Sequence, residues 1–191
     1  DEYCFKYDMI RYLKEGGTFL LNTSFPVDEL EKHLPNRLLA SLAKKHAKFF
    51  VIDATKIAQE IGMGRRTNTI LQSAFFALNE QIMPYDQAVD LMKKAAKKSY
   101  GKKGDEIVQL NYKAIDEGKA GIVEVAVDPS WADLPYDTNR KSTGDEYFDE
   151  HVMAINSLDG YDLPVSAFTK NNLLDGSIRN NVAFKEKRTI A

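Results

Sequence analysis

The residues with the clearest capacity for chemistry are two arginines that follow closely spaced glycines in Gly62-Met63-Gly64-Arg65-Arg66-Thr67-Asn68. A strongly apolar helical pattern follows directly, so free backbone N–H groups, a helix dipole and two guanidinium groups would meet, a combination suited to phosphate. The segment is neither a Walker loop nor a Gly-x-Gly-x-x-Gly fingerprint, because no Gly-Lys-Ser/Thr follows and position 67 is threonine. The competing interpretation is a helix corner, with Thr67 or Asn68 as cap and the arginines paired to acids. The residues expected to hold an anion are Gly62, Gly64, Arg65, Arg66 and Asn68.

A second group of polar and glycine residues flanks the short apolar run 19–21. Ligands of open α/β sheets bind beyond the carboxyl ends of strands, where Asn22, Thr23 and Ser24 fall. Asp53 and Thr55 follow the second apolar run and would lie at the same edge. Turn and cap chemistry is the alternative, because it prefers the same residue types. The residues of this second candidate site are Gly16, Gly17, Thr18, Asn22, Thr23 and Ser24.

Other residue types that support catalysis or metal binding are scattered. The three histidines show no His-Glu-x-x-His spacing, and no serine sits in a Gly-x-Ser-x-Gly elbow. The single cysteine, Cys4, excludes an internal disulfide, a thiolate zinc site and an iron–sulfur cluster. We therefore expect no catalytic residue and no metal ligand. The lysines at 93–94, 97–98 and 102–103 form either a solvated helix face or a surface for an acidic partner domain or a polyanionic ligand.

Short apolar strands that alternate with helices predict an α/β fold. We expect parallel neighbouring strands at 18–22 and 49–53 and an edge strand at 122–127. The expected helices cover 5–15, a short stretch from Pro26, 37–48, 54–61, 67–82, 84–99 and 105–117. The helix at 67–82 is apolar on several faces, which predicts burial of Ile70, Leu71, Phe75 and Phe76 against the sheet. The predicted architecture is a three-layer Rossmann-like domain at 1–127, mostly parallel with helices on both faces, then a small irregular module at 128–191.

Length and composition narrow the function classes. The 191 residues allow one large domain or one domain with an appended segment. A net charge of -2 gives no reason to expect nucleic acid as a partner. No apolar run approaches the ~18–20 residues that span a membrane, and the first residues lack the pattern of a signal peptide. We therefore expect a cytoplasmic chain that contacts no membrane. The start at Asp1 without a methionine suggests a piece of a longer protein.

Several stretches, in chain order, resemble the gamma domain of pyruvate:ferredoxin (flavodoxin) oxidoreductases. The resembling blocks are 12–22, 50–54, 61–68, 72–76, 99–104 and 127–131, together with Asn111. The tail is similar to the small module that this family names for a Glu-Lys-Arg motif. Its resembling residues are those at 163–168, Asp175-Gly176 and Glu186-Lys187-Arg188.

The resemblance implies a role within a larger enzyme. That enzyme decarboxylates pyruvate oxidatively with thiamine diphosphate, forms acetyl coenzyme A and passes electrons through iron–sulfur clusters to ferredoxin or flavodoxin. Thiamine and clusters are expected on other domains, so the chain alone should be inactive. Coenzyme A binding at the two candidate sites and packing against other domains of a homodimeric enzyme are the implied roles. A purely structural scaffold is the alternative.

Overall fold

The computed structural model describes residues 2–135 and 142–170, with side chains up to residue 167. Its contacts divide the chain into two compact units. Of the described residues, the first unit holds 2–5 and 9–135, and the second holds 6–8 and 142–170. The resembling residues Asp175-Gly176 and Glu186-Lys187-Arg188 lie outside the described part.

A three-stranded sheet forms the centre of the first unit. Its strands are β1 (Thr18–Asn22), β2 (Lys48–Ile52) and β3 (Val123–Val125), in the order β1-β2-β3. β1 and β2 run parallel from Thr18 opposite Lys48 to Asn22 opposite Ile52, which confirms the predicted pairing. β3 is antiparallel, with Val123 opposite Val51. The predicted α/β fold is confirmed, and its sheet is mixed. β3 is antiparallel because the chain enters it at the carboxyl end of β2 and does not first cross back to the amino end.

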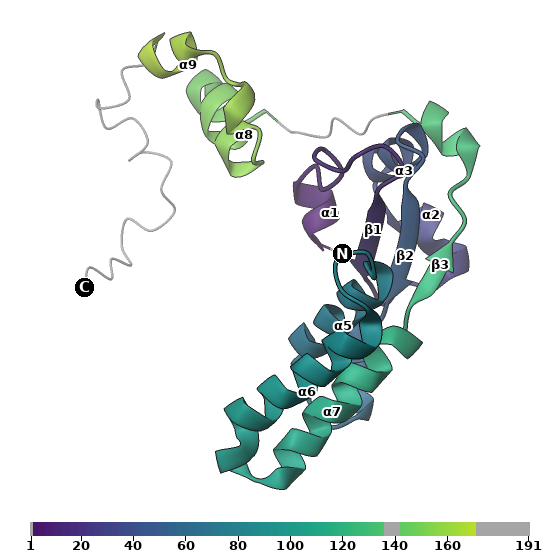
Figure 1. Cartoon of the computed structure of the whole chain (residues 1–191). Coiled ribbons are helices and arrows are strands. Elements are labelled where there is room, and N and C mark those ends of the chain that lie inside the picture. The colour runs from purple at the N-terminus through teal and green to yellow at the C-terminus, as the bar shows by residue number, and fades with distance from the viewer. Residues whose placement is uncertain (1, 136–141, 171–191) are drawn as a thin grey trace, which may run out of the picture. The chain divides into compact units, whose positions relative to one another are not determined.

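Helices surround this sheet and extend from it. All but the last residue of α1 (Glu2–Lys6) belongs to the first unit. Its other helices are η1 (Val27–Glu29), α2 (Leu30–His33), α3 (Asn36–Lys44), α4 (Ala54–Glu60), α5 (Asn68–Leu78), α6 (Tyr85–Tyr100), η2 (Gly101–Lys103), α7 (Asp105–Ala120) and η3 (Pro129–Asp133). Figure 1 shows α5, α6 and α7 side by side in an elongated layer that continues from the sheet. We refer to these three helices as the helical arm.

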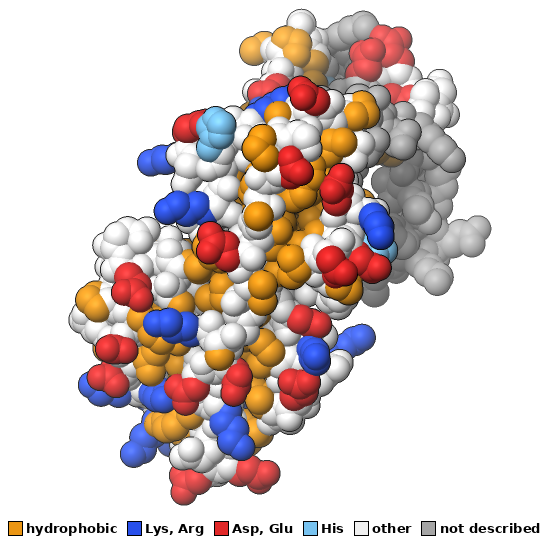
Figure 2. All heavy atoms as spheres, turned by 90° about the vertical axis from the view of Figure 1, so that its right-hand side faces the viewer, with side chains coloured by type: hydrophobic (Ala, Val, Ile, Leu, Met, Phe, Trp, Pro, Cys, Tyr) orange, Lys and Arg blue, Asp and Glu red, His pale blue; other side chains and the backbone are white. Residues whose placement is uncertain are grey.

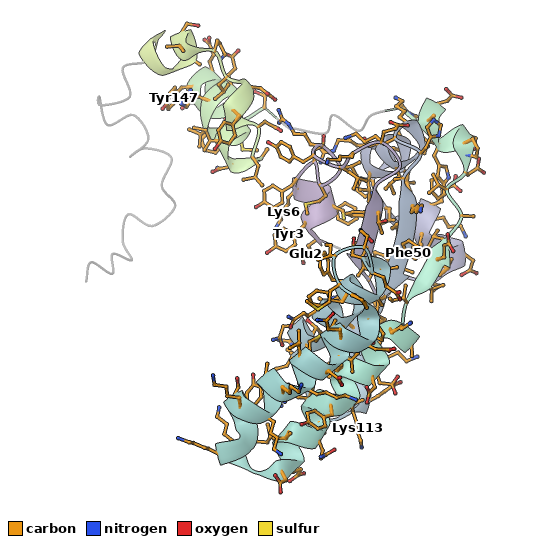
Figure 3. All side chains as sticks on the ribbon, in the orientation of Figure 1. Glu2, Tyr3, Lys6, Phe50, Lys113 and Tyr147 are labelled. Atoms are coloured by element: carbon orange, nitrogen blue, oxygen red, sulfur yellow. The ribbon has the colours of Figure 1, made fainter. Side chains whose placement is uncertain are left out.

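The strands alternate between two hydrophobic cores. Leu21 and Phe49 face a first core shared with α3 and η3, while Leu20 and Ile52 face a second core shared with α4, α5 and α7. This alternation is the period of two that a strand imposes on its side chains. Phe50, labelled in Figure 3, lies on β2 between its two partner strands.

The first core also receives a residue from beyond the predicted domain boundary at residue 127. Trp131, in η3, is buried against α3 and the sheet. Asp128 begins η3 by accepting a hydrogen bond from the Ser130 N–H at 2.8 Å. The first unit therefore continues through the end of its described residues at 135.

The helix predicted at 5–15 is wrong beyond Lys6, where α1 ends and turns follow. The reason is a single lysine on the facing segment. The Nζ of Lys45 donates hydrogen bonds to the carbonyl oxygens of Ile10, Arg11 and Leu13 at 2.7, 2.9 and 2.8 Å. Lys45 thus supplies hydrogen bonds to carbonyl groups that a continuing helix would pair with N–H groups four residues later.

The helix predicted at 67–82 is α5, which ends at Leu78, and only part of its predicted burial is confirmed. Ile70 is fully buried, whereas Leu71 and Phe76 are half-buried. The prediction is wrong for Phe75, which is 46% exposed. The face of α5 that meets α7 carries the small residues Ser73 and Ala74, so the large apolar side chains are left partly uncovered.

The second unit consists of short helical segments. They are a π-helical turn, Phe148–Val152, followed by α8 (Met153–Asn156), η5 (Gly160–Asp162) and α9 (Val165–Lys170). Asp149 accepts hydrogen bonds from the hydroxyls of Ser142 and Thr143 at 2.6 and 2.7 Å. These bonds, with one from the Thr143 amide, hold the pKa of Asp149 below its ordinary value.

Candidate functional site

The parallel pairing of β1 and β2 brings the predicted strand-end residues to one edge of the sheet. Asn22 ends β1, and Asp53 directly follows β2. The Oδ1 of Asn22 accepts a hydrogen bond from the Ala54 N–H at 2.9 Å, and the Oδ1 of Asp53 accepts one from the Lys56 N–H at 2.9 Å. Both side chains therefore cap the first turn of α4, as the turn-and-cap interpretation expects.

The next residue, Thr23, fixes the chain after β1. Its N–H donates to the Ile52 carbonyl at 3.0 Å, which extends the strand pairing by one bond. Its buried Oγ1 accepts a hydrogen bond from the Phe25 N–H at 3.2 Å and holds the following turn. Ser24, between these anchored residues, is exposed.

These residues line a cavity of about 360 Å³ at the carboxyl edge of the sheet. Its lining consists of Asn22, Thr23, Ser24, Asp53, Thr55, Lys56 and Gln59. The three predicted site residues at 22–24 are thus brought together, as the strand-end argument predicts. Lys56 and Gln59 were not predicted from the sequence. Their positions in the first two turns of the helix that follows β2 could have indicated that they lie near the same edge of the sheet.

The cavity offers hydrogen-bonding groups and one cation. Ser24, Thr55 and Gln59 are exposed and make no side-chain hydrogen bond to any described residue. Lys56 makes a long contact with Glu60, with Nζ and Oε1 4.0 Å apart and both side chains largely exposed. Asp53 already occupies the positive end of the short helix α4. The cavity therefore suits a polar ligand whose negative groups approach Lys56 rather than the helix end.

Gly16, Gly17 and Thr18 lie at the opposite end of β1 from the cavity. Five strand residues separate the two ends by about 13 Å at the usual rise of ~3.3 Å per residue. Gly16 has φ +66°, and its N–H donates to the Lys45 carbonyl at 2.8 Å. A Cβ on Gly17 would lie 2.8 Å from both Leu13 Cδ1 and the Lys14 carbonyl oxygen. These contacts give both glycines a structural role in the turn that enters β1.

The arginine loop, residues 62–68, connects α4 to α5 and does not contribute to the cavity lining. Gly62 has φ +87° and ends α4 in a Schellman motif. In this motif the Met63 N–H donates to the Ala58 carbonyl oxygen at 2.7 Å, and the Gly62 N–H donates to the Gln59 carbonyl oxygen at 3.1 Å. Gly64 also has a left-handed backbone, with φ +64°. Glycine is favoured at both positions because residues with a Cβ rarely adopt a positive φ.

The helix-corner interpretation of this loop is wrong for its side chains. Arg65 and Arg66 are exposed, and neither pairs with an acid among the described residues. Arg66 instead donates from Nε to the Met63 carbonyl at 3.1 Å. Thr67 occupies the cap position of α5 without a side-chain cap bond, and Asn68 supplies none. The loop therefore presents two unneutralised cations beside a helix start.

The cysteine and two of the histidines are not part of either candidate site. Cys4 is buried, and burial raises the pKa of its thiol, which makes the thiolate scarce. His33 stacks on Phe25 with ring centres 4.3 Å apart, and His46 is largely exposed. Across residues 2–135 and 142–170, no group of three His, Cys, Asp or Glu side chains is arranged to hold a metal ion.

The surface of the helical arm carries both charge signs. On the face shown in Figure 2, lysine and acidic side chains alternate over the arm instead of forming one basic field. Among the described helices, none is both long and apolar enough to cross a membrane.

Comparison with known proteins places the chain among oxidoreductases. Residues 1–121 match the family model described as pyruvate ferredoxin/flavodoxin oxidoreductase. The chain is 39% identical over 190 residues to the pyruvate:ferredoxin oxidoreductase of Moorella thermoacetica and 38% identical to the pyruvate-flavodoxin oxidoreductase of Klebsiella pneumoniae. Both alignments cover 99% of this chain and 16% of the relative. A pyruvate dehydrogenase [NADP(+)] of Cryptosporidium parvum is 36% identical over 99% of this chain and 11% of the relative.

The chain thus spans about a sixth or less of the length of these relatives. The family match covers more than half of the chain and includes β1, β2 and the whole lining of the cavity. On this match, the chain belongs to the pyruvate ferredoxin/flavodoxin oxidoreductase family.

Proposed function

We propose that this chain is a non-catalytic segment of an enzyme that oxidatively decarboxylates pyruvate to acetyl coenzyme A and reduces ferredoxin or flavodoxin. Its own contribution is coenzyme A binding and packing against other domains of the same enzyme. Family membership supports the enzyme class, and the names of the relatives support pyruvate as the substrate. We further propose that the whole enzyme is a cytoplasmic homodimer.

The observation that carries the ligand role is the cavity at the carboxyl edge of the sheet. Its volume of about 360 Å³ falls within the ~300–1,000 Å³ that is usual for small-molecule sites. Coenzyme A combines amide, hydroxyl and phosphate groups. Ser24, Thr55 and Gln59 supply hydrogen-bonding partners for the first two, and Lys56 supplies a cation for a phosphate. Arg65 and Arg66, exposed in the loop after the carboxyl end of α4, are the second proposed site for a phosphate of the same ligand.

The other cofactors of the proposed reaction belong on other domains. A four-cysteine cluster site does not fit this chain, which has one cysteine, and that residue is buried. The relatives that share this segment are named for ferredoxin, flavodoxin or NADP(+). A segment common to enzymes with such different acceptors is better suited to a step they share than to recognition of the acceptor.

The structural scaffold is the second candidate function. The glycines Gly16, Gly17 and Gly62 favour it, because backbone geometry accounts for each of them without a ligand. On this alternative the cavity and the arginine loop would be covered by neighbouring domains, and coenzyme A would be bound elsewhere.

Separate measurement of two partial reactions in the whole enzyme distinguishes these functions. We would compare Ser24→Ala/Lys56→Gln and Arg65→Ala/Arg66→Ala with the control Lys97→Ala/Lys102→Ala, which removes one exposed lysine from α6 and one from the adjoining η2. A lost charge-assisted hydrogen bond is worth ~1.5–3 kcal/mol, or about 10–150-fold in affinity. The apparent constant for coenzyme A should rise by at least about tenfold in the first two variants.

The decarboxylation step requires no coenzyme A and should be unchanged in all three variants. Equal losses in decarboxylation and acetyl transfer, with an unchanged urea midpoint, would leave the scaffold function and remove the ligand role. A change in the control as large as that in the cavity variant would show a non-specific charge effect and would also count against the site.

A further inference from the structure

An apolar groove runs between α5 and α6, away from the carboxyl-edge cavity. Its volume is about 210 Å³, and its lining residues are Gln72, Phe76, Met83, Ala88, Leu91, Met92 and Ala95. Leu91 is 48% exposed, and Phe75, which directly precedes the lining residue Phe76 on α5, is 46% exposed. These large apolar side chains are partly exposed to solvent, whereas other parts of the surface of the helical arm carry polar residues. A cluster of partly exposed apolar residues around a groove is typical of an interaction surface.

Near the groove, α6 contributes two lysines, whereas the acid Glu80, three residues before Met83, is paired with Lys119 at 3.9 Å. α5, with the sequence NTILQSAFFAL, contributes no charged side chain. On α6, Lys98 follows Leu91 by seven residues, which is two helical turns, so it lies on the groove side of the helix. Lys94 follows Leu91 by three residues and lies beside it at the edge of the groove. Asp90 is one residue from Leu91 and is rotated about 100° around the helix from it. Within the described residues neither lysine has an ion-pair partner.

We propose that this groove is the docking site for an acidic amphipathic helix from another part of a longer polypeptide. The occupant places one large apolar side chain in the groove and carboxylates against Lys94 and Lys98, the helix-in-groove mode of recognition. The inference rests on the part of the proposed function that sets this segment within a larger enzyme. It adds the place and the chemistry of one inter-domain contact.

Three observations favour this occupant over others. The groove is smaller than the ~300 Å³ at which small-molecule sites begin, so it fits a side-chain anchor better than a cofactor. The basic rim selects a partner with carboxylates. In the relatives, the aligned segment is 16% of the polypeptide, so most of the chain that could cover the groove lies in the same molecule.

Photo-cross-linking in the native polypeptide that carries these residues tests the proposal. The photoreactive residue p-benzoylphenylalanine would replace Leu91, and in a control it would replace the exposed Lys113 on α7 (Figure 3). Mass spectrometry should locate the Leu91 cross-link in an acidic helical segment of the same polypeptide, outside the 191 residues. Lys94→Glu/Lys98→Glu should lower its yield about tenfold or more, because like charges then face each other. Lys97→Glu/Lys102→Glu, with the same change in net charge off the rim, should alter it by less than about twofold.

Two results would overturn the proposal. A covalent dimer would show that a second copy covers the groove, and a yield no higher at Leu91 than at Lys113 would show that water covers it. A thermal unfolding midpoint equal to that of the unmodified protein shows that a lost cross-link does not come from unfolding. Coenzyme A affinity depends on the separate carboxyl-edge cavity, so failure of the docking site leaves the cofactor experiment unaffected.

Discussion

Gly118 offers a sharp test of how the helical arm is packed. It lies within α7 at the closest approach to α5. A Cβ at this position would be 2.5 Å from the Ile70 carbonyl oxygen and 2.6 Å from the Ser73 Cβ. The backbone oxygen cannot rotate away as the end of a flexible side chain can. Gly118→Ala therefore requires the two helices to move apart.

The expected change in the free energy of unfolding has one stabilising and two destabilising contributions. Alanine is favoured over glycine inside a helix by ~1 kcal/mol. Overpacking costs ~1–3 kcal/mol, and the backbone contact places this site at the upper end. Separation of the helices also disturbs the hydroxyl of Ser73, which donates to the Ile115 carbonyl at 2.5 Å and lies 2.9 Å from the Tyr85 hydroxyl, for a further ~1 kcal/mol. The net effect is a destabilisation of about 2–3 kcal/mol.

Urea denaturation followed by far-ultraviolet circular dichroism measures this effect. At a slope of ~1–3 kcal/mol per molar urea, the midpoint should fall by about 1–2 M. Gly101→Ala is the matched control, because Gly101 has φ -56° and a Cβ there meets nothing within 4 Å. That control should be neutral or stabilising by ~0.4–1 kcal/mol. A Gly118→Ala protein as stable as the parent, beside a well-behaved control, would refute the close approach of α5 and α7.

Three further predictions concern the rest of the structure. Lys45→Met keeps the aliphatic stem but removes three hydrogen bonds to the turn at 10–13, so urea denaturation should show a loss of at least ~1.5–3 kcal/mol, the value of one charged hydrogen bond. Phe49→Ala should cost ~3–5 kcal/mol in the same assay because Phe49 is fully buried, and Phe75→Ala should cost clearly less because Phe75 is 46% exposed. The pKa of Asp149 is lower in the folded protein than in the unfolded chain, so its contribution to stability is present above about pH 4 and is lost as pH falls through the folded-state pKa. The protection factor of the Thr143 amide, which is its intrinsic exchange rate at each pH divided by the observed rate, should fall over that acid range, and Asp149→Asn should abolish this change.

The strands and their pairing could be predicted because each is short, apolar and bounded by polar or glycine residues. Once two such strands are parallel, their carboxyl ends must share an edge. The position of Asn22 beside Asp53 is therefore a consequence of topology that sequence alone can supply. The direction of β3 could not be derived in this way, because three residues carry no signal of orientation.

The errors have two physical sources. The stripe at 5–15 has a helical period, but the distant Lys45 captures its carbonyl groups, and a side chain 32–35 residues away has no local signature. In α5 the pattern shows which residues are apolar, but it does not show how much surface the neighbouring helices cover. Ser73 and Gly118 set that coverage by allowing close contact on one face, which leaves Phe75 at the surface.

The polar residues at the carboxyl edge show why capping and ligand binding are not exclusive functions for one motif. Asn22 and Asp53 each use an Oδ1 atom to cap α4, and both side chains also line the cavity. Capping fixes the walls of the cavity, because it ties the end of β1 to the helix after β2. Ser24, Thr55 and Gln59 take no part in that capping, so their hydrogen-bonding groups remain available for a ligand. Substitution of Asn22 should therefore affect stability and ligand affinity together, whereas Ser24→Ala should reduce affinity for coenzyme A without changing the urea midpoint.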